Sequence, residues 1–378
     1  AGPFAAFPGS ENPGPNDKTI KAMRTMNAMK TMKMRMAAYA AGCLCCLSLA
    51  GTSCTTGEEP VYDNPLRTSA GDTVRLADPF VYESDGLYYM TGTTVSAETS
   101  GFDYYVSPDL VTWEYGGPLF RRSPAHFGAG AFWAPEVERY EGRFYMTYSC
   151  LEPERGVLLS CLAVSDRPEG PFEDLYPPWF DLGFSAIDCD IFVDDDPQHT
   201  PYLYFSKNGN RDGYAFGENW VVRLKKALSG FDGEPRLVSR ASQPWELVNR
   251  ERNRCNEGAF VFKRAGVYYM TYSANDTGYS DYGVGVATAP HPLGPWTKSE
   301  DNPLMTTDLA RGVSSPGHGC VVDLPDGESY FFYPRHADPH GSKPSFDRVV
   351  CMDRLFFDGD GALRTDGPSS EPQRKPGL

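Results

Sequence analysis

One structural plan recurs five times along this chain of 378 residues. In each copy a polar residue leads an apolar alternating strand, a tight turn rich in Gly or Asp follows, and an aromatic strand returns. Alternation with period two is typical of a half-buried strand, and a short turn between two such runs predicts a hairpin. The lead residues, spaced 52 to 69 positions apart, are Asp78, Glu136, Asp188, Glu257 and His318.

Repeats of this length predict a propeller, whose four-stranded blades surround a central channel. A third and a fourth strand follow each hairpin, as at 104–107 and 111–114 in the first copy. The 38 Gly, 32 Pro and 13% aromatic residues favour many short strands joined by tight turns. We therefore predict an all-β, five-bladed propeller with four antiparallel strands per blade over residues 61–375. The alternative fold, two stacked β-sandwiches, would not explain why acidic residues recur at equivalent positions of the repeats.

The first strand of each blade lines the channel, so the lead residues are expected to converge at one mouth. Carboxylates crowded into one pocket do not ionise independently, because like charges raise the pKa of at least one of them. Such a pocket can hold a general acid beside a general base, as glycoside hydrolysis requires. Phe80, Phe132, Trp133 and Phe260 would offer apolar surface to a sugar ring.

Five motifs, in this order between residues 73 and 358, resemble those of glycoside hydrolase family 43. They are Ala77-Asp78-Pro79-Phe80, Trp133-Ala134-Pro135-Glu136, Ala186-Ile187-Asp188, Asn256-Glu257-Gly258 and Pro316-Gly317-His318-Gly319. The resemblance implies a five-bladed propeller and an inverting mechanism. The third motif departs from the family's Ile-Asp-Pro, because Cys189 stands where Pro is usual.

The resemblance also implies roles for individual residues. Asp78 is similar to the family's general base and Glu257 to its general acid. Asp188 is similar to the third acid, which tunes the pKa of the general acid and positions it. His318 resembles a channel histidine found near a central calcium ion, and Arg335 resembles a substrate-binding arginine of exo-acting members. No cofactor is expected to be required, and structural Ca²⁺ in the channel is an implied alternative.

Several residues also have a purely structural interpretation. Asp190 lies two positions after Asp188 on the same strand and competes with it for the same role. Glu136 follows a proline and is expected to hydrogen-bond the channel backbone. His318 can be a satisfied core histidine, and Trp133 can pack between blades. Residues 194–196 are interpreted as a solvated hairpin turn.

The first 60 residues are predicted to be a leader without a fold of its own. Basic residues precede an apolar run at 36–50, which is typical of an export signal and short for a membrane span. Residues 51–54 resemble a lipoprotein cleavage site, so either Cys54 carries a lipid anchor or the signal is plainly cleaved. We expect a periplasmic or cell-surface lipoprotein or, alternatively, a secreted protein.

The net charge of the chain argues against nucleic acid as a binding partner, and the spacing of its cysteines argues against a cysteine metal site. Residues 1–54 hold six Lys or Arg and two Asp or Glu, so the rest holds 29 and 48, a net charge of −19. Such an acidic body makes nucleic acid an unfavourable partner. The six cysteines of the body lack the paired spacing of metal ligands. A bridge between Cys150 and Cys161 across a hairpin is left open by the sequence.

The sequence thus predicts an inverting glycosidase that acts on carbohydrate and releases α-L-arabinofuranosyl or β-D-xylosyl units from plant cell-wall material. One alternative is a retaining fructan hydrolase, although an Asn-Gly pair typical of that nucleophile loop is absent around Asp78. Another is a sugar-binding propeller without activity, which would have little use for three crowded acids. Residues 92–103, 121–132, 207–219 and 275–283 are predicted to shape the pocket.

Overall fold

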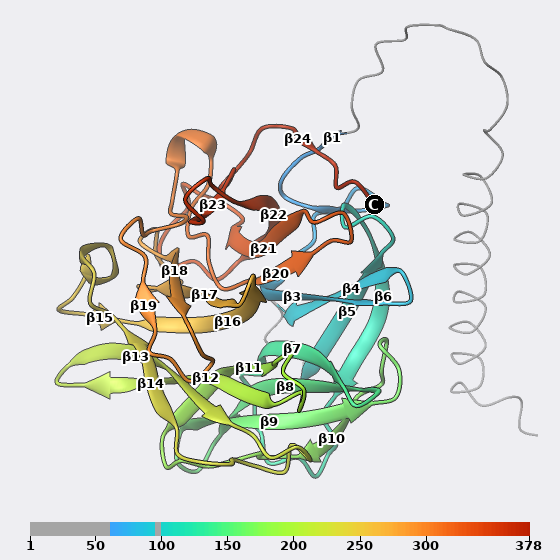
Figure 1. The fold of residues 1–378 in the computed structure, drawn as a ribbon, viewed down its shortest axis with the longest axis vertical. Coiled ribbons are helices and arrows are strands. Elements are labelled where there is room, and N and C mark those ends of the chain that lie inside the picture. The colour runs from blue at the N-terminus through green and yellow to red at the C-terminus, as the bar shows by residue number, and fades with distance from the viewer. Residues whose placement is uncertain (1–60, 95–99) are drawn as a thin grey trace, which may run out of the picture. The chain divides into compact units, whose positions relative to one another are not determined.

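Five antiparallel sheets are arranged around a central channel in the computed structural model, which describes residues 61–94 and 100–378 (Figure 1). The predicted leader lies outside these residues. Among the described residues, no helix is long and apolar enough to cross a membrane. The predicted all-β, five-bladed propeller is confirmed, and most blades have four strands.

The blades follow the order of the chain, and in each of them the first strand lies innermost (Figure 1). Blade 1 holds β3 (Ala77–Ser84), β4 (Leu87–Thr93), β5 (Gly101–Ser107), β6 (Thr112–Arg121) and the short β2 (Arg67–Thr68). Blade 2 holds β7 (Trp133–Tyr140), β8 (Arg143–Glu152), β9 (Val157–Ser165) and β10 (Glu173–Tyr176). Blade 3 holds β11 (Ser185–Val193), β12 (Pro201–Arg211), β13 (Tyr214–Arg223), β14 (Arg236–Arg240) and β15 (Asn253–Arg254).

The last two blades have four strands each. Blade 4 holds β16 (Asn256–Arg264), β17 (Val267–Ala274), β18 (Gly283–Ala289) and β19 (Thr297–Lys298). Blade 5 holds β20 (Cys320–Asp323), β21 (Ser329–His336), β22 (Arg348–Phe357) and β23 (Leu363–Thr365). The 3₁₀ turns are η1 (Pro244–Leu247) and η2 (Leu309–Arg311).

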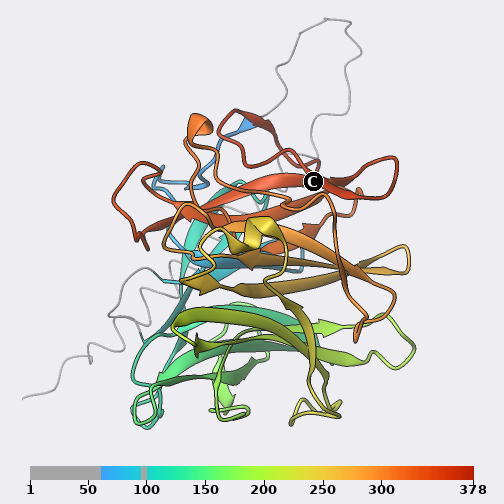
Figure 2. The same cartoon turned by 90° about the vertical axis from the view of Figure 1, so that its left-hand side faces the viewer.

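The apolar core lies between neighbouring blades, as the side view in Figure 2 helps to follow. One cluster joins blades 2 and 3 around Phe205, a second joins blades 3 and 4 around Tyr204, and a third joins blades 4 and 5 around Phe331. The alternation of each strand therefore buries one face against the preceding blade and the other against the following blade.

The ring is closed by the two ends of the described chain. β1 (Val61–Tyr62) pairs with β24 (Gln373–Arg374) in a small antiparallel sheet. Asn64 then binds blade 5, because its side-chain amide donates to Met352 O and its Oδ1 accepts from Met352 N–H, both at 2.9 Å. β3 also contacts β20, β21 and β22, so blade 5 lies against blade 1.

A shared irregularity marks the start of the innermost strands. The pairing of β3, β7, β11 and β16 with its partner shifts by one residue at the same place in each blade. The residues there adopt positive φ between 44° and 57°, and their equivalent in blade 5 does so too: Asp78, Ala134, Asp188, Gly258 and His318. A β-bulge of this kind re-aims side chains at the rim of a sheet.

This irregularity corrects the predicted alignment of the repeats. Asp78, Asp188 and His318 do occupy one equivalent position, but Glu257 lies one residue before it and Glu136 two residues after it. An extra residue on one strand shifts every following side chain by one position, which the period-two pattern alone does not reveal.

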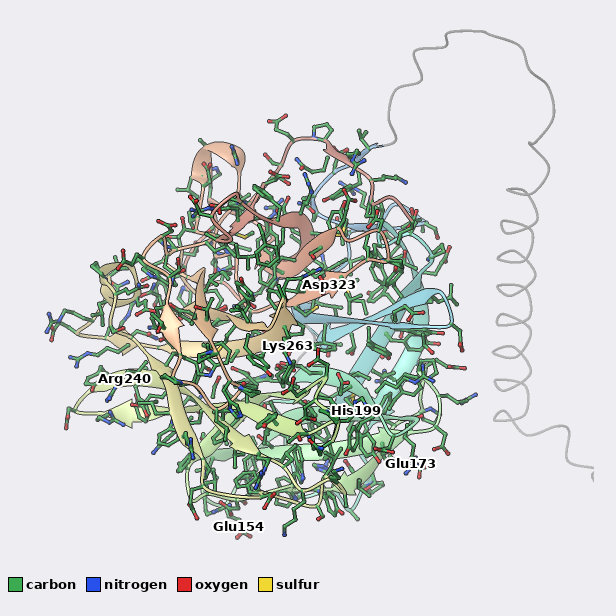
Figure 3. All side chains as sticks on the ribbon, viewed as in Figure 1. Glu154, Glu173, His199, Arg240, Lys263 and Asp323 are labelled. Carbon is green, nitrogen blue, oxygen red and sulfur yellow. The ribbon has the colours of Figure 1, made fainter. Side chains whose placement is uncertain are left out.

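At the opposite end of the inner strands, the predicted solvated turn at 194–196 is corrected for Asp194, whereas Asp195 is exposed. Asp194 is buried, accepts from the hydroxyl of Tyr268 at 2.8 Å, and forms an ion pair with Lys263 Nζ at 2.9 Å. Lys263, labelled in Figure 3, also pairs with Asp195. The hairpin of blade 3 is therefore tied by charge to the hairpin of blade 4.

Candidate active site

A cavity of about 610 Å³ opens at the mouth of the channel where the inner strands begin. Three predicted site carboxyls line it, and they come from three different blades: Asp78, Asp188 and Glu257. His318, Phe132 and Trp133 also line it. The volume lies within the range of about 300–1,000 Å³ that is usual for small-ligand pockets.

Asp78 is held between a hydroxyl and a charged ring. Thr93 Oγ1 donates to Asp78 Oδ2 at 2.6 Å, and His318 Nδ1 lies 3.1 Å from Asp78 Oδ1. Burial alone would raise the pKa of Asp78, but the ion pair and hydrogen bond with His318 outweigh it, and this pKa lies below its usual value. Asp78 is therefore an ionised carboxylate at neutral pH, suited to accept a proton.

Asp188 has the opposite electrostatic environment. Burial raises its pKa to about 7, and the neighbouring carboxyls of Glu257 and Asp78 add to the rise, against the opposing charge of His318. Its Oδ2 accepts from Gly258 N–H at 3.3 Å. Asp188 is thus linked to the backbone next to Glu257 and can be protonated near neutral pH.

Glu257 is held by two neutral donors. Tyr282 Oη donates to Glu257 Oε1 at 2.8 Å, and Cys255 Sγ donates to Glu257 Oε2 at 3.2 Å. Within the described part of the chain no cationic side chain forms an ion pair with Glu257. The site therefore contains an ion-paired carboxylate and a second carboxyl bound only by uncharged groups.

Hydroxyl side chains join the starts of neighbouring blades, and the sequence analysis did not assign them. Thr93 accepts from Ala134 N–H at 2.7 Å, Ser206 from Gly258 N–H at 3.2 Å, and Ser273 from His318 N–H at 2.7 Å. Each hydroxyl residue pairs with the residue just before the bulge of the inner strand, so a Ser or Thr recurring after the aromatic run was the available signal. In the described structure Ser149 holds the equivalent position, and its Oγ has no hydrogen-bond partner.

His318 is surrounded by carboxyls. Burial disfavours its charged form, yet Asp188 and Asp78 raise the pKa of His318 well above its ordinary value. Nδ1 faces Asp78, and Nε2 lies 4.0 Å from Glu136 Oε1. A protonated ring has no lone pair for a metal, and Ca²⁺ prefers oxygen ligands. These surroundings do not fit direct binding of calcium by His318, so no step of the mechanism depends on calcium.

The competing acids lie deeper in the channel. Glu136 and Asp190 are closely packed with Phe80 in a region that leaves no space for a water molecule, away from the main cavity. Burial raises the pKa of Glu136 and of Asp190, and Asp190 accepts from Val261 N–H at 3.0 Å. Because the bulge lies between positions 187 and 190, Asp188 and Asp190 do not reach the same space. Asp190 therefore does not compete with Asp188 in the cavity.

Three predicted substrate contacts are not among the cavity-lining residues. Phe80 and Phe260 pack against each other, with ring centroids 6.0 Å apart, inside the channel. Arg335 is buried, and its guanidinium donates to the carbonyls of Gly312 and His336. The two phenylalanines come two residues after the bulge and therefore lie deeper in the channel than its mouth. The guanidinium of Arg335 instead binds backbone carbonyl groups.

Trp133 does line the cavity, with 41% of its surface exposed, and a second aromatic residue and an arginine join it there. Arg348 donates to Thr277 Oγ1 at 2.6 Å and lies 5.5 Å from the ring centroid of Phe346. Its charge also helps to lower the pKa of Asp78. The sequence analysis missed Phe346 and Arg348, since no repeat signal marks the loop before β22. The four predicted pocket-shaping stretches all contribute lining residues.

A second group of potential metal ligands lies inside blade 2. His126, Cys150 and Cys161 have ligand atoms within 4.8 Å of one another. Both ring nitrogens of His126 are already engaged, Nδ1 by Gly128 N–H and Nε2 by the hydroxyl of Tyr148, each at 2.9 Å. The two Sγ atoms are 3.9 Å apart, nearly twice the roughly 2.05 Å of a disulfide. In this structure the pair consists of free thiols within a satisfied polar core.

The fold and the site define a propeller with several carboxyls around one sugar-sized cavity. The model of the glycosyl hydrolases family 43 matches residues 70–363, and the chain belongs to this family. The chain is 29% identical over 316 residues to the β-D-galactofuranosidase xynD of Aspergillus niger, covering 78% of this chain and 84% of that protein. It is 26% identical to a xylosidase/arabinosidase of Bacteroides ovatus, covering 77% of this chain and 94% of that protein.

Solved structures of the same family resemble this one. A thermostable family-43 glycoside hydrolase is 40% identical, with a TM-score of 0.77, over 83% of this chain and 99% of that chain. An endo-1,4-beta-xylanase from Bacteroides thetaiotaomicron is 32% identical, with a TM-score of 0.68, over 80% of this chain and 97% of that chain. The protein is thus a family 43 glycosidase, and its relatives differ in the sugars they are named for.

Proposed function

We propose that this glycosidase releases pentose units, α-L-arabinofuranosyl or β-D-xylosyl, from plant cell-wall polysaccharides or oligosaccharides by inversion. The observation that carries the proposal is the meeting of Asp78, Asp188 and Glu257 in one cavity, in different electrostatic environments. A mechanism with one base and one acid needs two carboxyls in opposite protonation states.

In the proposed reaction Asp78 takes a proton from a water molecule as that water attacks the anomeric carbon. Glu257 gives its proton to the departing glycosidic oxygen, so the sugar is released with inverted configuration. Asp188 accepts a hydrogen bond from Gly258 N–H and so helps to orient the neighbouring Glu257. Trp133 and Phe346 offer apolar surface to the sugar, and Arg348 offers hydrogen-bond donors.

The stereochemistry is tested by proton NMR of freshly released product. An inverting enzyme yields β-arabinose from an α-arabinofuranoside and α-xylose from a β-xyloside before mutarotation. Release of the same anomer as the substrate would overturn the single-displacement mechanism and would favour a retaining enzyme of the fructan-hydrolysing kind, to be checked on sucrose and inulin.

The sugar is tested by a panel of nitrophenyl α-L-arabinofuranoside, nitrophenyl β-D-xyloside and linear arabinan. Nitrophenyl β-D-galactofuranoside belongs in the panel because the A. niger relative is named for that activity. We expect a pentoside to be hydrolysed fastest. Preference for galactofuranoside would refute the pentose assignment, and binding without hydrolysis of every substrate would support a non-catalytic propeller.

We also propose that the protein acts outside the cytoplasm, because the apolar run at 36–50 is preceded by basic residues. Metabolic labelling with a radioactive or clickable fatty acid distinguishes the two routes. Label that is lost in a Cys54→Ala variant indicates a lipid anchor, and unlabelled protein in the medium indicates a cleaved signal.

A further inference from the structure

The contacts of Glu257 include a thiol that the reaction itself does not require. Cys255 lies two residues before Glu257, and its Sγ donates to Glu257 Oε2 while the hydroxyl of Tyr282 donates to Oε1. One donor therefore engages each oxygen of the carboxyl. Two bonds from different directions restrict the rotation of a side chain that would otherwise have several rotamers.

The thiol is fixed by its surroundings. Cys255 N–H donates to Asn253 Oδ1 at 2.9 Å, and Cys255 O accepts from Asn275 N–H at 3.2 Å. The neighbouring strand β13 carries a glycine here, and a Cβ on Gly217 would collide with Cys255 Sγ. The cysteine is buried, so its position depends on packing rather than on solvent.

The phenol of Tyr282 is fixed in a similar way. Tyr282 is 2% exposed, and a Cβ on Gly317 would collide with its ring. Gly317 precedes His318, so the same backbone segment that carries the partner of Asp78 also makes room for the second donor to Glu257. Both donors thus pack against glycines.

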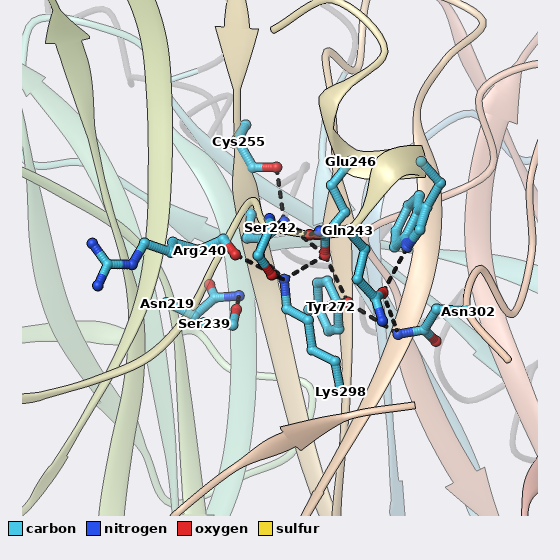
Figure 4. A network of polar contacts seen from close by, with 12 residues as sticks. Asn219, Ser239, Arg240, Ser242, Gln243, Glu246, Cys255, Tyr272, Lys298 and Asn302 are labelled. Atoms are coloured by element: carbon cyan, nitrogen blue, oxygen red, sulfur yellow. Dashed lines mark hydrogen bonds and ion pairs between the residues drawn. The ribbon is translucent and has the colours of Figure 1, made fainter. Parts of the chain in front are cut away.

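A buried charged network binds Asn256, the first residue of β16, as Figure 4 shows. Lys298 Nζ donates to Asn256 Oδ1 at 2.8 Å and pairs with Glu246, which is fully buried. Tyr272 Oη donates to Glu246 Oε1 at 2.8 Å, and Asn256 Nδ2 donates to Cys255 O at 3.0 Å. Residues 255 and 256 are therefore immobilised, and the backbone of Glu257 is immobilised with them.

We propose that Cys255 is a positioning residue, whose thiol acts with the hydroxyl of Tyr282 to hold the Glu257 carboxyl toward the leaving-group oxygen. This inference rests on the proposed function, in which Glu257 is the general acid. Without the thiol, the Glu257 carboxyl loses one of its two donors and samples more orientations.

The kinetic test compares Cys255→Ala with Cys255→Ser and Tyr282→Phe. We expect Cys255→Ala to lower kcat about 10-fold with little change in KM. Cys255→Ser keeps a donor and should restore at least half of the lost logarithmic activity. Tyr282→Phe should lower kcat at least as much, since a phenol is a stronger donor than a thiol.

A matched control separates positioning from packing. Cys351→Ala removes another buried thiol, in blade 5, and should lower the melting temperature while kcat stays near the wild-type value. A loss of kcat in Cys351→Ala as large as in Cys255→Ala, or equal losses in Cys255→Ala and Cys255→Ser, would overturn the proposal in favour of a packing role.

A measurement without substrate separates this proposal from the assignment of the general acid. The side-chain carboxyl signal of Glu257 is followed by ¹³C NMR of the glutamate-labelled protein and assigned by its loss in Glu257→Gln. Its chemical shift at one fixed pH should change in Cys255→Ala and return toward the wild-type value in Cys255→Ser, because the thiol contacts the carboxyl directly. A shift that changes while Glu257→Gln retains full activity supports the contact and refutes Glu257 as the acid. A shift that does not change refutes the role of the thiol.

Discussion

The starts of β3 and β16 carry the two carboxyls of the proposed reaction, and they hold them in different ways. Asp78 at the start of β3 is bound by a hydroxyl and by the charged ring of His318. Glu257 at the start of β16 is bound by a phenol and a thiol, both neutral. The nearest charged pair behind it, Lys298 and Glu246, acts on Asn256 rather than on the carboxyl itself.

This difference shows how the bulged start of an inner strand, repeated in each blade, can carry either a general base or a general acid. A fixed positive charge stabilises the ionised state of Asp78 throughout the neutral range, which suits a base. Two neutral donors, a phenol and a thiol, instead orient the carboxyl of Glu257. The bulge that starts each inner strand provides the position, and the neighbouring blade provides the electrostatics.

The largest expected effect comes from removing either carboxyl. Asp78→Asn and Glu257→Gln should each lower kcat/KM on an oligosaccharide about 1,000-fold, within the range usual for acid–base groups. On a dinitrophenyl glycoside, whose leaving group needs no proton, Glu257→Gln should recover most of its activity and Asp78→Asn should not. Steady-state kinetics on both substrates measures this, and recovery by Asp78→Asn instead would reverse the two roles.

The ion pair between Lys298 and Glu246, next to β16, is removed by Lys298→Met. This variant leaves the carboxylate of Glu246 buried without its charged partner. Such a change typically costs about 3–5 kcal/mol, and we expect an unfolding free energy lower by about 3 kcal/mol in urea titrations. Glu246→Gln combined with Lys298→Met should recover part of this loss. A single variant as stable as the wild type would show that the network does not secure the strand.

The shared backbone geometry is tested at the position equivalent to Asp78 in blade 4. Gly258 has φ of +57°, and a Cβ there would lie 2.7 Å from His318 Cδ2. Gly258→Ala should therefore cost about 2 kcal/mol of stability through strain and crowding. Gly266→Ala, in the hairpin of the same blade with nothing near its Cβ, is the matched control for positive φ alone. Equal losses in both would exclude a specific contact with His318.

The smallest effect is a pH dependence that separates the two carboxyls. His318 lowers the pKa of Asp78, so Asp78 stays ionised to lower pH when His318 is present. In His318→Gln burial raises the pKa of Asp78 again, and the acidic limb of the kcat/KM profile should move to higher pH. We expect about a 10-fold loss at pH 5 and a smaller one at pH 8. An acidic limb that stays in place would show that His318 does not control the base.

The period-two alternation and the recurring turns predicted the blades, because both depend on neighbours along the chain. The same repetition predicted that Asp78, Asp188 and Glu257 would share a mouth, and the structure brings them to one cavity. It did not predict the depth of Phe80 and Phe260, which pack against each other inside the channel and do not line the cavity. A one-residue bulge moves a side chain to a different depth, and a strand pattern carries no record of that shift.

By itself the sequence determined the number of blades, their order, and the three acids that lead their inner strands. Only the closed ring decided what surrounds those acids. The charge on His318 and the placement of Arg348 depend on residues more than 60 positions apart or on a loop without a repeat. Local patterns specify which surface of a strand is buried, whereas protonation states follow from the groups that closure brings within a few ångströms.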